Sequence, residues 1–141
     1  MTGLILLALL AAPPPESLDA VRATPNLEKR AELAIDYAGS ALTRARKIVS
    51  ESGARTDLES ALKEVEAACQ LALDSLRQTG KRPSKLSSQY KKAELKTRGF
   101  VKDLSDLAAA LSLDDRPAAE AVRDKVQLLH EDFLLGVMGG K

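Results

Sequence analysis

The sequence is poor in the residues that usually carry chemistry. Its 141 residues include one cysteine, Cys69, and one histidine, His130. A single cysteine excludes an intrachain disulfide and the multi-cysteine zinc and c-type haem motifs. A single histidine cannot supply the two Glu-x-x-His motifs of a di-metal helical bundle. Glycine-rich phosphate loops and calcium-binding loops are also absent from the sequence. We therefore expect no cofactor, no metal and no enzymatic activity.

Aromatic residues are also scarce, at 3% of the chain, and tryptophan is absent. Ala, Leu, Glu, Lys and Arg predominate, and these residues favour helices over strands. Lys and Arg together number 21 against 20 Asp and Glu, so the net charge is only +1. A chain of this length and hydrophobic content is expected to form one domain. Its balanced charge offers no global case for binding a nucleic acid or a membrane surface.

The sequence has no apolar run long enough to span a bilayer, which takes about 20 residues. The longest run, LILLALLAA at residues 4–12, has the size of a signal-peptide core, and the prolines at 13–15 end any helix there. Ala23 offers a small-residue cleavage site. We predict that residues 1–23 are a signal peptide with a short linker and that the protein is periplasmic or extracellular. The alternatives are a cytoplasmic protein, or an N-terminal segment that packs on the remaining domain, residues 24–141.

Apolar residues recur at steps of three and four in four segments, as in amphipathic helices. Thr24 is expected to cap the first segment, and Thr56 with Glu59 forms a capping-box pattern for the second. Gly53 and Gly80 stand where helices commonly end in a left-handed residue. The helices are predicted at about 25–52, 57–79, 87–111 and 114–138.

Helices of similar length with short connections favour antiparallel neighbours. We therefore predict an all-α protein, an antiparallel up-down-up-down four-helix bundle. The inward stripe of the first helix is rich in alanine, and Cys69 falls on the inward stripe of the second. A three-helix bundle with the first helix detached ranks second, because it would expose a long apolar stripe.

Basic residues gather in residues 77–102, which hold nine Lys and Arg against Glu94 alone. This segment has a net charge of +8 in a chain whose total is +1. On the third predicted helix, three cations and one leucine align opposite the apolar stripe. The residues predicted to contact an anionic partner are Lys81, Arg82, Lys85, Lys91, Leu95, Arg98 and Lys102. The alternative is an ordinary solvated helix face.

These features favour an exported, non-enzymatic helical-bundle protein that acts by contact with a protein or an anionic component of the cell envelope. The alternative is binding of an anionic polymer, lipid or nucleic acid through residues 77–102. Nucleic acid is the less favoured partner, because few aromatic or amide side chains are interleaved with the cations. A third hypothesis is a metal or haem bundle centred on His130. Outward leucines would support a homodimer if they were contiguous; they are Leu33, Leu71, Leu95 and Leu135.

Overall fold

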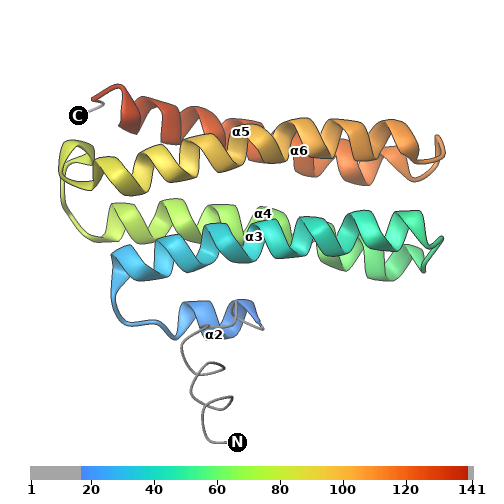
Figure 1. The fold of residues 1–141 in the computed structure, drawn as a ribbon, viewed down its shortest axis with the longest axis horizontal. Coiled ribbons are helices and arrows are strands. Elements are labelled where there is room, and N and C mark those ends of the chain that lie inside the picture. Colours follow the sequence, from blue (N-terminus) through green and yellow to red (C-terminus); the bar gives the residue numbers. More distant parts are fainter. Residues whose placement is uncertain (1–16, 140–141) are drawn as a thin grey trace, which may run out of the picture.

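The computed structural model describes residues 17–139, and all regular structure in this range is helical. Five helices pack together (Figure 1), which confirms the predicted all-α class. The elements are α2 (Leu18–Arg22), α3 (Leu27–Ser50), α4 (Arg55–Gln78), the 3-10 turn η1 (Pro83–Leu86), α5 (Ser87–Ala110) and α6 (Arg116–Val137). Each predicted end of the four long helices lies within two residues of the observed end.

The four long helices form two hairpins, α3 with α4 and α5 with α6. The hairpins meet where α3 packs against α5 and where α4 packs against α6. Figure 1 shows that α3 and α5 run in one direction, while α4 and α6 run in the opposite direction. Consecutive helices are therefore antiparallel neighbours within each hairpin, as expected. Between the hairpins, the neighbours are parallel.

The α4–α5 connection explains this difference from the predicted order. Residues 79–86 join α4 to α5 and include η1. With four residues extended at about 3.3 Å each and the four of η1 rising about 2.0 Å each, this connection reaches up to about 21 Å. It can therefore carry the chain across the bundle, and α5 packs beside α3 instead of beside α4. The preference of short connections for neighbouring helices does not apply to this longer one.

The predicted inward stripes are confirmed as the hydrophobic core. In α3 the stripe is made largely of alanine, and these small side chains allow close approach of neighbouring backbones. Larger side chains from α4, α5 and α6 fill the remaining core volume. Fully buried members include Ala34, Ala38, Ala41 and Ala45 of α3, Leu62, Val65 and Cys69 of α4, Leu104 of α5, and Val126 and Phe133 of α6.

A short helix precedes the four long ones, in a region that the sequence assigned to a leader and linker. Ser17 caps α2 by accepting a hydrogen bond from the backbone N–H of Ala20 at 3.1 Å. Leu18 and Val21 of α2 are buried, and the helix packs against α3 and α4. Five residues are too few to show a helical period in sequence. The predicted signal-peptide core at residues 4–12 lies outside the described residues.

Two predicted helix caps are wrong. The cap of α3 is Asn26 instead of Thr24, and its side-chain oxygen accepts the N–H of the third helical residue at 2.9 Å. The cap of α4 is Ala54, without a side-chain hydrogen bond, so Thr56 and Glu59 form no capping box. At α3 the sequence offers two capping residues within three positions, Thr24 and Asn26, whereas α4 begins before Thr56 without any side-chain cap.

The left-handed residue after α3 also differs by one position from the prediction. The left-handed residue is Ser52, with φ of 54°, instead of Gly53. Gly53 follows it and donates its N–H to the carbonyl of Ile48 at 2.8 Å, as in a Schellman motif. A side chain at Gly53 would crowd Ile48, so glycine at this position allows the turn to lie close to Ile48. Gly80 after α4 has φ of 71°, as predicted.

Candidate functional site

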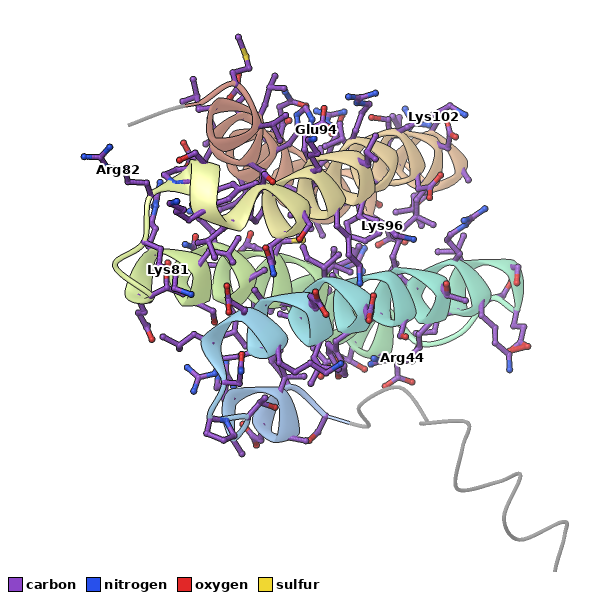
Figure 2. The ribbon with its side chains drawn as sticks, turned by 60° about the vertical axis from the view of Figure 1, so that its left-hand side comes forward. Arg44, Lys81, Arg82, Glu94, Lys96 and Lys102 are labelled. Carbon is purple, nitrogen blue, oxygen red and sulfur yellow. The ribbon has the colours of Figure 1, made fainter. Side chains whose placement is uncertain are left out.

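The seven predicted contact residues lie on two parts of the molecule, and all seven are exposed. Lys81, Arg82 and Lys85 belong to the α4–α5 connection and η1. The other four residues form a line along the outer side of α5, named the α5 ridge: Lys91, Leu95, Arg98 and Lys102. Figure 2 shows Lys81 and Arg82 at one end of the bundle and Lys102 far along α5. The ridge spans about 16 Å at 1.5 Å per residue, so the basic set is extended instead of compact.

Some of these cations are already engaged within the molecule. The Lys81 ammonium lies 3.5 Å from a Glu28 carboxylate oxygen, which ties the α4–α5 connection to α3. Arg98 pairs with Glu94 on its own helix. Within residues 17–139, no ion pair forms at Arg82, Lys85, Lys91 or Lys102. These four cations are therefore the ones whose charge remains open to a partner.

Glu94, the one acidic residue within residues 77–102, is buried. Its side chain is 5% exposed, and its carboxylate accepts a hydrogen bond from the Arg98 guanidinium. A buried carboxylate without a partner would be strongly unfavourable. Arg98 therefore neutralises Glu94, which gives this ridge cation a structural role as well. The sequence does not reveal this role of Arg98, because its position relative to the apolar stripe shows only that it lies on the polar side of the helix.

His130 faces Glu94 from α6. Its Nε2 atom lies 3.7 Å from the Glu94 carboxylate, and its side chain is 12% exposed. In the described part of the chain, neither ring nitrogen has a hydrogen-bond partner. No group of three or more His, Cys, Asp or Glu side chains within residues 17–139 is placed to hold a metal ion.

Cys69 is fully buried in α4, as its place in the apolar stripe predicted. Burial raises the pKa of this thiol from 9.0 to about 12, and Glu66 contributes in the same direction. The thiolate is the reactive form of cysteine. The folded protein therefore holds Cys69 as a protonated, inaccessible thiol.

We expect native Cys69 to resist a thiol reagent such as DTNB at pH 8 and to react with one equivalent once the chain is unfolded in guanidinium. The absorbance of released thionitrobenzoate measures both states. Because the folded pKa is raised, the thiol's contribution to stability is complete below about pH 9 and is lost as the pH rises toward 12. Rapid labelling of the native protein would contradict the burial of Cys69.

The outward leucines are only partly as predicted. Leu95 and Leu135 are 60% and 58% exposed, in agreement with the sequence. Leu33 and Leu71 were expected to face solvent, but they are partly buried and pack against the core. Both lie on the α3–α4 hairpin, against which α2 packs. The predicted homodimer surface is therefore reduced to Leu95 and Leu135. Further exposed apolar side chains that the prediction did not include are Leu113, Leu128 and Met138.

A cleft of about 600 Å³ opens at the end of the bundle that carries Lys81 and Arg82. A third cation, Arg77, comes from the last turn of α4. The walls come from α4, the α4–α5 connection, α5 and the last turns of α6. They consist of Leu73, Gly80, Pro83, Tyr90, Asp132, Leu135 and Gly136. The sequence grouped Arg77, Lys81 and Arg82 in the basic stretch 77–102, but it did not predict that they line a cleft with Tyr90.

Gly136 allows Tyr90 to lie against α6. A Cβ atom at position 136 would overlap the Tyr90 ring at Cδ1 and Cε1. The ring meets Phe133 edge-on, with ring centroids 6.2 Å apart. Burial raises the pKa of the Tyr90 hydroxyl; the charge of Arg77 opposes this shift and that of Asp132 adds to it. The wall of the cleft thus depends on a residue that lacks a side chain.

Comparisons with family models, curated proteins and solved structures found no match to this chain. Within residues 17–139, no helix combines the length and apolar character needed to cross a membrane. The function is therefore inferred from the surfaces described above.

Proposed function

We propose that this protein is an exported, non-enzymatic helical bundle whose four long helices act as one up-down-up-down unit. It acts by contact with another protein or with the cell envelope through the α5 ridge. The observation that carries this proposal is the exposed Leu95 between the unpaired cations Lys91 and Lys102. An exposed apolar side chain within a basic surface suits a partner that presents acidic groups around an apolar depression.

The two components of such a contact respond differently to salt. Lys91 and Lys102 are exposed, and exposed charges are screened beyond about 8 Å at physiological ionic strength. Full burial of Leu95 would contribute about 1.5–3 kcal/mol, and this term does not depend on charge. Affinity should therefore fall with added salt without vanishing.

The test uses the ridge variant Lys91→Gln/Leu95→Ala/Lys102→Gln. Arg98 is left unchanged because it neutralises Glu94. The matched control removes two exposed lysines and one exposed leucine elsewhere, Lys63→Gln/Lys125→Gln/Leu128→Ala. In an envelope extract, a partner should be retained by the wild type and the control and reduced at least tenfold with the ridge variant. Equal retention by both variants, or no retained component, would contradict the proposal.

A second candidate function is the binding of an anionic polymer or lipid through residues 77–102. The four unpaired cations favour it, because each is free to approach a phosphate or sulfate. On heparin or anionic vesicles, Arg82→Gln/Lys85→Gln in addition to the ridge changes should lower the salt concentration needed for release. Retention that is unaffected by these changes would exclude this function.

We propose export because residues 4–12 form an apolar run of the size of a signal-peptide core. The packing of α2 indicates where such a signal peptide would end. Because Leu18 and Val21 are buried on the bundle, a mature chain that keeps α2 is favoured over a start at residue 24. N-terminal sequencing of the protein from its native host would test this. An intact Met1 on cytoplasmic protein would contradict export.

A further inference from the structure

We propose that the cleft between the α4–α5 connection and the last turns of α6 binds a small organic anion. The ligand class is a phosphate ester or carboxylate carried on an apolar body about the size of a benzene ring. This site is separate from the α5 ridge, since none of the four ridge residues lines the cleft. The proposal therefore does not depend on the contact function.

Charge in the cleft favours an anion. The lining holds Arg77, Lys81 and Arg82 against Asp132, a net charge of +2, and Lys81 is also paired with Glu28, which lies outside the lining. Arg77 lies 3.6 Å from Asp132, so one carboxylate faces a guanidinium that has five N–H donors. Donors of Arg77 are left for a second oxyanion, which guanidinium groups can bind in a bidentate manner. Arg82 extends from the connection into solvent in Figure 2, so it lies at the rim of the site.

The remaining lining suits an apolar body. Pro83 and Leu135 supply accessible apolar surface beside the cations, and the buried side chains of Leu73 and Tyr90 lie behind it. Leu135 is 58% exposed, so a ligand would remove apolar surface from water at this residue. The volume of about 600 Å³ falls within the range of about 300–1,000 Å³ that small-molecule sites occupy.

Two glycines shape the cleft. Gly80 has φ of 71° and turns the chain after α4, and no atom lies near the place where its side chain would be. The ring of Tyr90 occupies the space that a side chain at position 136 would need. Tyr90 thereby forms a wall between α5 and α6 instead of extending into solvent. Both glycines line the cleft, so its shape is built into the backbone of the bundle.

The experiment is a ¹H–¹⁵N NMR titration of the whole chain with phenyl phosphate and, separately, with benzoate. At least one of them should cause saturable shifts at Gly80, Arg82 and Gly136, and the tighter of the two identifies the preferred anion. Inorganic phosphate and phenol, which each supply one half of the ligand, should bind at least tenfold more weakly. Shifts absent from these residues, or spread equally over the α5 ridge, would overturn the proposal.

The matched variants are Arg77→Gln and Arg46→Gln. Both arginines are 58% exposed, and each faces an aspartate on a neighbouring helix, at 3.6 Å and 3.7 Å. Only Arg77 lines the proposed cleft. Arg77→Gln should weaken binding at least tenfold, whereas Arg46→Gln should change it less than twofold. Equal effects of the two substitutions would overturn the proposal.

A second pair keeps the test valid if Arg77→Gln disturbs folding. Leu135→Ala removes exposed apolar surface from the cleft, and Leu128→Ala removes a leucine of similar exposure two turns earlier in α6. Leu135→Ala should weaken phenyl phosphate or benzoate binding about threefold or more and leave inorganic phosphate unchanged. An equal effect of Leu128→Ala on the organic anions would contradict a site at the cleft.

Discussion

Replacing Phe133 with alanine is expected to lower the free energy of unfolding by about 3–5 kcal/mol, the range for removing a buried aromatic ring. Phe133 is fully buried in α6, and its ring packs edge-on against Tyr90. The substitution removes apolar contacts and leaves a cavity that the surrounding helices can fill only in part. Guanidinium unfolding followed by circular dichroism measures the change.

The control for this prediction is Leu128→Ala, five residues earlier in the same helix. Leu128 is 61% exposed, so its truncation should change the free energy of unfolding by no more than about 0.5 kcal/mol. A loss below about 1 kcal/mol for Phe133→Ala would show that its ring is not packed in the core as described. It would also call into question the position of Tyr90, which forms one wall of the cleft.

Replacing Ala38 with leucine is expected to lower the free energy of unfolding by about 1–3 kcal/mol, the range for overpacking. Ala38 is fully buried in the alanine stripe of α3. Leucine and alanine have similar helix propensities, so the effect would come from packing and not from the helix itself. The added side chain would push α3 away from its neighbours. Thermal and guanidinium unfolding both measure the loss.

Ala121→Leu serves as the matched control, because Ala121 is exposed on α6. The same substitution there should leave stability within about 0.5 kcal/mol of the wild type. If Ala38→Leu proved equally neutral, the space beside α3 would be larger than the burial of its alanines indicates. The close-approach role of the alanine stripe would then be wrong.

The sequence was most informative about single helices. Steps of three and four located all four long helices, and they identified buried positions such as Cys69 and the alanine stripe of α3. Helix ends were less certain, because neighbouring residues compete for the same role. Asn26 replaced Thr24 as a cap, and Ser52 replaced Gly53 as the left-handed residue. These differences are small because the apolar pattern, not the cap, determines where each helix packs.

The candidate sites were less predictable than the helices. A helical pattern gives the direction of Leu33 or Leu71 relative to its own apolar stripe, but not how far a neighbouring element extends over it. The sequence showed no α2, so it could not predict that α2 packs against the hairpin that carries these two leucines. It likewise showed Glu94 as one acid among cations, although this carboxylate is buried facing His130.

By itself, the sequence determined the helical class, the extents of the long helices, the core stripes and the concentration of cations between residues 77 and 102. These properties depend on residues a few positions apart, and helical geometry relates such residues directly. Only the tertiary structure decided that the helices that meet between the hairpins run parallel and that Arg77, Lys81, Tyr90 and Gly136 line one cleft. Those relations connect residues as many as 63 positions apart (Leu73 to Gly136), and they depend on the path of the α4–α5 connection across the bundle.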